Sequence, residues 1–88
     1  MVVLGSTGSI GTNTLNLARK FGLGVEALSC ASNYELLNEQ IAEFKPKFVC
    51  IAEPKFAKFV KHKRVFAGAQ GICDMLKECG SEGVVNSL

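Results

Sequence analysis

The feature that most constrains the fold is the glycine-rich segment GSTGSIG at residues 5–11. It follows a short apolar run, Met1 to Leu4, and precedes residues with helical spacing. The apolar run is too short for a helix and suits a strand that is buried on both faces of a parallel sheet. A strand, a glycine turn and a helix in this order are typical of a phosphate-binding turn at a helix N-terminus.

The three glycines fit the tasks of a dinucleotide-binding turn. Gly5 allows a tight turn, Gly8 lets the backbone approach a pyrophosphate, and Gly11 permits helix-against-strand packing. The spacing is one residue longer than in GxGxxG, which leaves more backbone amides at the helix N-terminus. Thr7 and Ser9 add hydroxyl groups that suit phosphate oxygens. A plain glycine-rich turn is the alternative, but the flanking strand and helix favour a dinucleotide site.

Strand-like and helical patterns alternate along the rest of the chain. Strands are expected at 25–30, 48–51, 65–66 and 83–85, and helices at 11–21, at 33–44, from Pro54 and at 70–79. Short connections between such elements give right-handed crossovers and a parallel sheet. We therefore predict an α/β fold, a Rossmann-like parallel sheet with alternating helices. We expect it to be incomplete, because a further helix should cover an apolar strand near residue 88.

Helix faces and caps follow from the same spacing. The first helix is expected to bury an apolar stripe made of Ile10, Thr14, Leu17, Ala18 and Phe21. Gly22 can supply its left-handed C-terminal cap. Ser32 and Glu35 have capping-box spacing, which predicts Ser32 as the N-cap of the second helix. Phe56 and Phe59 are expected on the buried side of the third.

Composition and charge exclude several classes of function. The net charge of +2 is too small to indicate a nucleic-acid or membrane partner. No targeting segment or long apolar stretch is present in the 88 residues. The four cysteines contain no CxxC pair, which indicates reduced thiols and a cytoplasmic location; they are Cys30, Cys50, Cys73 and Cys79.

The end of the second expected strand is the next diagnostic position. A protein that binds NAD carries Asp or Glu there to hold the ribose hydroxyls. This chain instead has Cys30, Ala31, Ser32 and Asn33 in succession. The missing acid argues against NAD and leaves room for a 2′-phosphate, to which Ser32 and Asn33 could hydrogen-bond. For Ser32, the helix N-cap is the competing role.

Residues 4–11, LGSTGSIG, resemble the opening of the 1-deoxy-D-xylulose 5-phosphate reductoisomerase family, NADPH-dependent enzymes of non-mevalonate isoprenoid biosynthesis. The segment ALSCASN is similar to the family's second strand and its Gly-Lys-Asn or Gly-Arg-Asn turn. The segments EFKPKFVCI, GICDML and VVNSL resemble its third strand and its next helix and strand, so the likeness covers the whole chain. The resemblance implies NADPH contacts at Thr7, Gly8, Ser9, Ile10, Ala31, Ser32 and Asn33.

The chain departs from the family pattern at one point. Ala31 and Ser32 stand where the family often has glycine and a cation. The salt bridge to the 2′-phosphate is therefore missing, and a different cation, such as Lys55 or one further along the chain, would be needed to replace it.

The resemblance also implies a reaction. The family converts 1-deoxy-D-xylulose 5-phosphate to 2-C-methyl-D-erythritol 4-phosphate, with hydride from NADPH and with Mg²⁺ or Mn²⁺ held by one aspartate and two glutamates. Those ligands lie in a region that this chain lacks. We therefore expect residues 1–88 to be a partial dinucleotide-binding domain, inactive alone, without the catalytic and C-terminal domains of a homodimeric enzyme. Glu35, Glu39 and Glu43 are interpreted as a solvated helix face, and His62 as a surface residue.

Two alternatives remain at this point. A GxTGxxG reductase of another family, related to semialdehyde dehydrogenases or epimerases, would show a downstream catalytic cysteine or a Tyr-x-x-x-Lys pair. A non-catalytic dinucleotide sensor would be encoded by a gene that ends after Leu88.

Overall fold

The computed structural model describes residues 1–79 and 84–86 and contains one five-stranded parallel sheet, in the order β4-β3-β2-β1-β5. The strands are β1 (Val2–Leu4), β2 (Ala27–Cys30), β3 (Phe48–Ile51), β4 (Val65–Ala67) and β5 (Val84–Asn86). The helices are α1 (Ser9–Phe21), α2 (Tyr34–Phe44), the 3-10 helix η1 (Pro54–Phe59) and α3 (Ala69–Glu78). The predicted α/β fold, a Rossmann-like parallel sheet with alternating helices, is confirmed.

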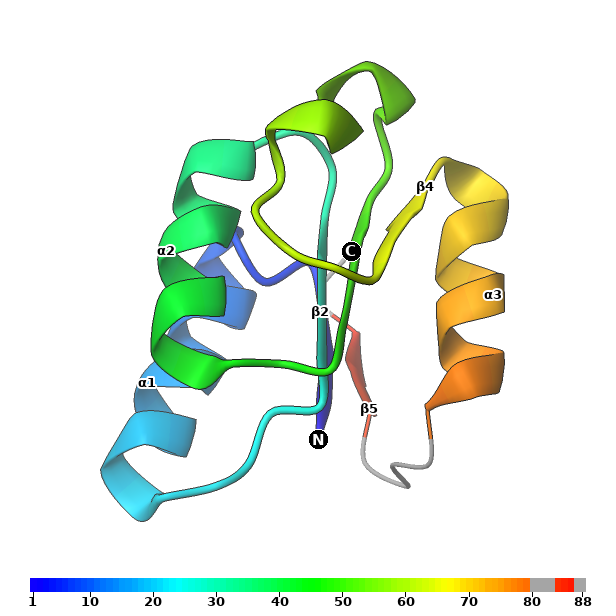
Figure 1. Cartoon of the computed structure of the whole chain (residues 1–88). Helices are drawn as coiled ribbons and strands as arrows, with labels where there is room; N and C mark the ends of the chain where they lie inside the picture. The colour runs from blue at the N-terminus through cyan, green and yellow to red at the C-terminus, as the bar shows by residue number, and fades with distance from the viewer. Residues whose placement is uncertain (80–83, 87–88) are drawn as a thin grey trace.

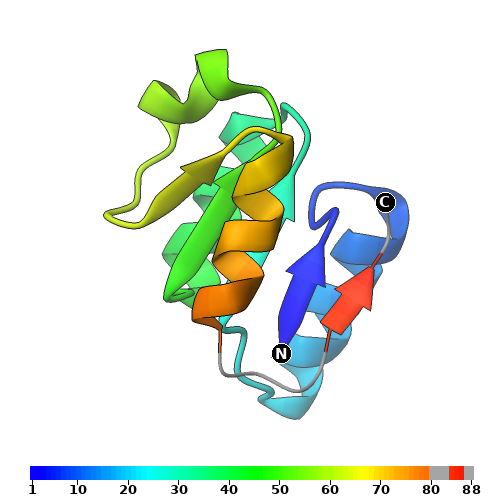
Figure 2. The same ribbon diagram turned by 90° about the vertical axis from the view of Figure 1, so that its right-hand side faces the viewer.

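Helices cover both faces of the sheet. α1 and α2 lie on one face and α3 lies on the other (Figures 1 and 2). The chain adds β2, β3 and β4 in turn on one side of β1, and α3 then returns it to β5 on the opposite side. The direction of strand addition therefore reverses between β1 and β5. In open α/β sheets, ligands bind at such a switch point, beyond the carboxyl ends of the strands.

Two apolar layers form the core because successive strand residues point to opposite faces of the sheet. Val3 and Leu28 pack in one layer with α1 and α2, whereas Val2 and Leu4 pack in the other with α3. The first three strands are buried at every position. This explains why β1 and β3 read as continuous apolar runs rather than alternating ones, whereas β2 has the polar Ser29 at a buried position.

The buried face of α1 differs from the predicted one. Gly11, Leu15 and Ala18 are its buried residues. The expected stripe is wrong for its three largest members, because Ile10, Leu17 and Phe21 are mostly exposed; Ala18 is buried as expected. Both sets of residues have helical spacing, so the pattern could not decide the rotation of the helix. Close packing of Gly11 against the preceding loop sets that rotation.

The caps of the first two helices test two further expectations. Gly22 has φ of 66° and donates its backbone N–H to the Ala18 carbonyl, so the predicted left-handed cap is confirmed. The predicted Ser32 N-cap of α2 is wrong: the cap is Asn33, whose Oδ1 accepts from the Leu36 N–H at 3.1 Å. The Ser32 carbonyl accepts from the Tyr34 N–H, which holds Ser32 in a turn before the helix.

The segment from Pro54 forms a short 3-10 helix rather than an α-helix. Phe56 is partly buried, but Phe59 is 45% exposed, so its predicted burial is wrong. The two rings lie beside the Tyr34 ring of α2, with centroids 5.4 and 5.0 Å from it. Aromatic contact therefore fixes η1 on α2.

The expected helix stop at Gly80 and the strand start at Gly83 lie outside the described residues.

Candidate functional site

The glycine-rich loop connects β1 to α1 at the carboxyl edge of the sheet. Gly5 has φ of 76°, a conformation that glycine adopts without strain. The Gly8 N–H donates to the Gly5 carbonyl at 3.1 Å, which closes a tight turn. Thr7 is half-buried, whereas Gly8, Ser9 and Ile10 are exposed. The loop therefore presents its second half to solvent at the start of α1.

The N-terminus of α1 is electropositive. Gly8 is the N-cap, no side chain caps the helix, and its first turn contains no acidic residue. The first four N–H groups of a helix have no partner within the helix, and the helix dipole adds a partial positive charge there. The Thr12 hydroxyl donates to the carbonyls of Gly8 and Ser9, not to an outside group. Exposed amides with no competing carboxylate suit an anion such as a phosphate group.

The last two glycines of the motif differ in the space around their Cα atoms. A Cβ atom on Gly11 would lie 2.1 Å from the Gly5 carbonyl oxygen and 2.7 Å from Ser6 Cα, which the backbone cannot accommodate. A Cβ atom on Gly8 would meet only the Gly5 carbonyl oxygen, at 3.6 Å, which is ordinary van der Waals contact. The fold therefore requires glycine at position 11 but not at position 8.

The second predicted segment, residues 31–33, follows β2 and is exposed. It lies at the same edge of the sheet because β1 pairs in parallel with β2, with Leu4 opposite Ser29. The Ser6 N–H donates to the Ser29 carbonyl at 2.8 Å, and the Gly5 N–H donates to Ser29 Oγ at 3.4 Å. The structure thus brings together the two predicted segments, whose members are Thr7, Gly8, Ser9 and Ile10, and Ala31, Ser32 and Asn33.

Two polar residues that hold the loop were missed in the sequence. Ser29 lies within β2 and contacts the loop as described above. Gln40 of α2 is only 6% exposed, and its Nε2 donates to the Ser6 carbonyl at 2.8 Å. A signal was present, because Gln40 falls on the same helical stripe as Leu37 and Ile41, where a polar residue is unexpected.

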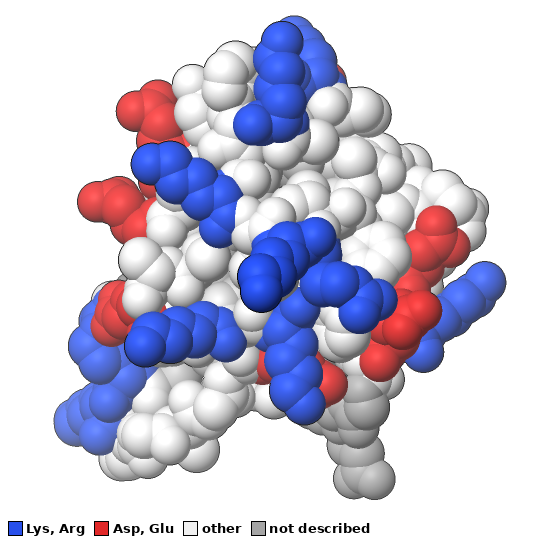
Figure 3. Space-filling model, viewed as in Figure 1, with Lys and Arg blue, Asp and Glu red and all other residues white. Residues whose placement is uncertain are grey.

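Cations lie at both edges of the sheet. Lys55 lies in η1, just after β3, at the same edge as the loop. A hollow of about 400 Å³ lies near the amino ends of β3 and β4, and Lys45, Lys47, Lys63 and Arg64 contribute to its lining. Figure 3 shows Lys and Arg side chains spread over the face seen in Figure 1. The cations of the hollow lie at the opposite edge from the loop, so of these residues only Lys55 lies at the edge where a 2′-phosphate could bind.

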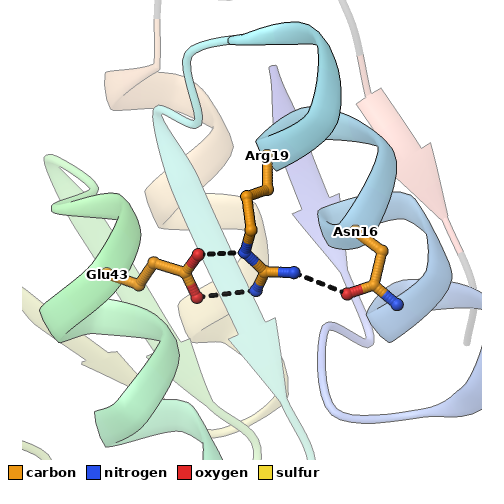
Figure 4. A network of polar contacts seen from close by, with 3 residues as sticks. All are labelled: Asn16, Arg19 and Glu43. Carbon is orange, nitrogen blue, oxygen red and sulfur yellow. Dashed lines mark hydrogen bonds and ion pairs between the residues drawn. The ribbon is translucent and has the colours of Figure 1, made fainter.

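An ion pair joins α1 to α2 (Figure 4). Arg19 binds both carboxylate oxygens of Glu43, with Nη2 to Oε1 at 2.7 Å, and Nη1 donates to Asn16 Oδ1 at 2.8 Å. The Glu43 carboxylate raises the Arg19 pKa, and the guanidinium lowers the Glu43 pKa. Both side chains are exposed, so the pair contributes little to stability.

Among residues 1–79 and 84–86, no group of three His, Cys, Asp or Glu could hold a metal ion.

The structure also shows the contacts of His62 and the burial of the cysteines. His62 Nε2 lies 2.7 Å from the Pro46 carbonyl, and Nδ1 accepts from the Arg64 N–H, so this ring joins two backbone segments. All four cysteines are free; Cys30 and Cys50 are buried and Cys73 is exposed. Burial raises the pKa of Cys30 and Cys50 to about 11.

No helix in the described part of the chain has the length and apolar character needed to cross a membrane.

Comparison with known proteins identifies related enzymes. The family model for 1-deoxy-D-xylulose 5-phosphate reductoisomerase matches residues 1–88. The curated protein of that name from Campylobacter hominis is 59% identical over 88 residues, which cover all of this chain and 24% of that protein. The one from Helicobacter pylori (strain G27) is 50% identical over 90 residues, again covering all of this chain and 25% of that protein. The chain therefore spans about a quarter of the length of these relatives.

A solved structure is also similar. It is the 1-deoxy-D-xylulose 5-phosphate reductoisomerase of Zymomonas mobilis in complex with NADPH. The TM-score is 0.76 at 30% sequence identity, and the match covers 83% of this chain and 21% of that one.

Proposed function

Because the chain belongs to the 1-deoxy-D-xylulose 5-phosphate reductoisomerase family, we propose that residues 1–88 form part of an NADPH-binding domain. The catalytic and C-terminal domains would be supplied by other parts of the enzyme. Two findings support this proposal: the chain spans about a quarter of its relatives, and a similar solved structure is a complex with NADPH.

The proposed cofactor contacts are divided between two segments. Thr7, Gly8, Ser9 and Ile10 would hold the pyrophosphate through backbone amides and hydroxyl groups at the start of α1. Ala31, Ser32 and Asn33 would face the adenosine ribose and its 2′-phosphate. NADPH supplies hydride to the substrate when bound. The residues of this chain bind and orient it.

The observation that carries the proposal is the space around Gly8. Its backbone is extended, with φ of −82° and ψ of 176°, and a Cβ atom would fit there without strain. Neither backbone conformation nor packing therefore requires glycine at this position. Close approach of an outside group to the exposed backbone is the remaining reason, and a pyrophosphate is the group that such a turn accommodates.

The activity of the complete enzyme is part of the same proposal. We propose that it acts on 1-deoxy-D-xylulose 5-phosphate as a homodimer in the cytoplasm, with Mg²⁺ or Mn²⁺ bound by residues outside positions 1–88. The free thiols of Cys30 and Cys50 are in line with a reducing compartment. The semialdehyde dehydrogenase-like or epimerase-like reductase and the dinucleotide sensor are not favoured, because the family model matches the whole chain.

The test is calorimetric titration with NADP⁺ of the protein at its full natural length. Wild type should bind, and Gly8→Val should lose at least about tenfold in affinity, because the branched side chain occupies the space of the pyrophosphate. Gly24→Val is the matched control, since Gly24 also has open space around it but lies between α1 and β2, at the other edge of the sheet.

Circular dichroism should show the same helical content in all three proteins. Equal affinity of wild type and Gly8→Val for NADP⁺ would remove the loop from the cofactor site.

A further inference from the structure

The hydrogen bond from Gln40 to the Ser6 carbonyl connects two segments that are far apart in sequence. Gln40 lies on α2 and its side chain enters the protein interior, where Nε2 donates to the Ser6 oxygen at 2.8 Å. Ser6 is fully buried and belongs to the glycine-rich loop. Among the described residues, Gln40 Oε1 and Ser6 Oγ are buried without a hydrogen-bond partner.

Leu37 and Ile41 form the apolar stripe of α2, where a buried glutamine is unexpected. An apolar side chain of the same length would remove the unpaired Oε1 but would leave the buried Ser6 carbonyl without this donor, and an unpaired buried acceptor carries the same kind of penalty. The two choices therefore differ mainly in what they do to the loop.

The bond fixes the direction of one peptide group. The peptide between Ser6 and Thr7 is trans, so its carbonyl and its N–H point in opposite directions. Gln40 holds the Ser6 carbonyl toward the buried side of the loop. The N–H of Thr7 must then point away from that buried side, and the residues that follow it, Gly8 and Ser9, are exposed.

A second contact restrains the preceding peptide. The Ser6 N–H donates to the Ser29 carbonyl of β2 at 2.8 Å. Both backbone polar groups of Ser6 are thus bonded to neighbouring elements, one to β2 and one to α2. Gln40 is the side chain that provides the second of these bonds.

We propose that Gln40 is a positioning residue for the proposed dinucleotide site, which sets the Thr7 amide as a donor to the pyrophosphate. This inference rests on the proposed function of the loop. It assigns to Gln40 no contact with the cofactor, because the residue acts through the Ser6–Thr7 peptide. Preorganised amides strengthen anion binding because they need no reorientation when the anion arrives.

The experiment compares two substitutions in the protein at its full natural length. Gln40→Met keeps the side-chain length but removes the donor, and should weaken NADP⁺ binding at least about fivefold with helical content unchanged. Without ligand, the ¹⁵N–¹H resonance of the Thr7 amide should shift and its hydrogen exchange should change.

Gln40→Glu provides a readout that a purely structural role would not give. A protonated carboxyl can donate to the Ser6 carbonyl, whereas a carboxylate repels it, and burial raises the pKa of such a group. The affinity of Gln40→Glu for NADP⁺, divided by that of wild type at the same pH, should rise toward one as the pH is lowered from 8 to 5.5. The charged residues lining the α1–α2 groove beside Gln40 are Arg19, Glu39 and Glu43, and they cancel in this ratio.

Gln70 supplies the matched control. It is exposed on α3, where its Nε2 lies 3.4 Å from Asp74 Oδ1. Gln70→Met and Gln70→Glu should bind NADP⁺ as wild type does at every pH.

The outcomes separate the two proposals. If wild type fails to bind NADP⁺, the proposed function is wrong, and the Thr7 resonance still reports whether Gln40 orients the loop. If wild type binds and Gln40→Met binds equally, the positioning role is wrong. If Gln40→Met fails to fold, Gln40→Glu replaces it as the test. An affinity ratio for Gln40→Glu that does not change with pH would then overturn the proposal.

Discussion

Leu15 and Leu17 lie two positions apart on α1 in opposite environments, the first 2% exposed and the second 54% exposed. Leu15 packs in the layer between α1, α2 and the sheet. Leu17 belongs to the outward-facing side with Ile10 and Phe21. Because the two side chains are identical, their different burial provides a direct test of the rotation of the helix.

Truncation of the two leucines should have very different effects on the stability of this chain. Leu15→Ala should lower the free energy of unfolding by about 2–4 kcal/mol, because it removes buried methyl groups and leaves a cavity. Leu17→Ala should change it by less than about 0.5 kcal/mol. Urea unfolding of both variants measures the difference. Equal losses would mean that α1 is rotated from the position described here.

Gly11→Ala should destabilise the protein although alanine is the better helix former. In an open helix position the substitution gains about 1 kcal/mol. Here the new Cβ atom would lie 2.1 Å from the Gly5 carbonyl oxygen, and such overpacking costs roughly 1–3 kcal/mol or more. Urea unfolding measures the effect, and the midpoint of Gly11→Ala should be lower than that of wild type. A higher midpoint would show that the helix does not pack against the loop.

The strands and the loop could be predicted from the sequence because their signals are local. Four-residue apolar runs such as Phe48–Ile51 are buried on both faces and therefore read as continuous hydrophobic segments. Gly22 could be predicted as a cap because a left-handed residue at a helix end is usually glycine. The loop glycines stand between a strand and a helix, which gives the motif its structural context.

The features that could not be predicted depend on tertiary contacts. The rotation of α1 is decided by the contact of Gly11 with Gly5, and two stripes of the helix had acceptable spacing. The N-cap of α2 lies one residue later than predicted, since Ser32 and Asn33 are both good capping residues and the turn at Ser32 selects Asn33. Gln40 lies on an apolar stripe, and only the structure shows that it reaches Ser6.

The thiols should differ in reactivity toward Ellman's reagent. Cys73 is exposed and should react rapidly at pH 8. Cys30 and Cys50 are buried, and burial raises the pKa of each to about 11, so both are protonated and inaccessible at that pH. They should react only after unfolding in urea. Fast reaction of all four thiols in the folded protein would contradict their burial.

The same pKa shifts should make stability fall at alkaline pH. Above about pH 9 these two thiols ionise in the unfolded chain, while the folded protein keeps their protons until about pH 11. The folded state therefore binds more protons in this window, so its stability decreases as pH rises through it. Urea midpoints measured from pH 8 to pH 11 should show a shallower decline for the Cys30→Ala/Cys50→Ala double variant than for wild type.

Ser32→Lys should strengthen the preference for NADPH over NADH. A cation at this exposed position would offer a charge-assisted hydrogen bond to the 2′-phosphate, which contributes roughly 1.5–3 kcal/mol. Titration with both cofactors gives the ratio of affinities. An unchanged ratio would place the 2′-phosphate away from Ser32.

Asn33→Asp should separate the capping role of Asn33 from its proposed cofactor contact. The Asn33 Oδ1 atom accepts from the Leu36 N–H, and an Asp carboxylate caps a helix equally well. Its negative charge at the start of α2 interacts favourably with the helix dipole by about 0.3–1 kcal/mol, so stability should be retained or slightly raised.

The same charge should repel a 2′-phosphate and can bind the ribose hydroxyls of NAD⁺, which shifts the preference from NADP⁺ toward NAD⁺. Asn33→Ala, which loses the cap, should cost about 1 kcal/mol in urea unfolding and should shift the preference less than Asn33→Asp, because it removes the side-chain contact without adding a negative charge. If Asn33→Asp keeps the wild-type ratio of NADP⁺ to NAD⁺ affinity, Asn33 is a helix cap alone and the 2′-phosphate lies elsewhere.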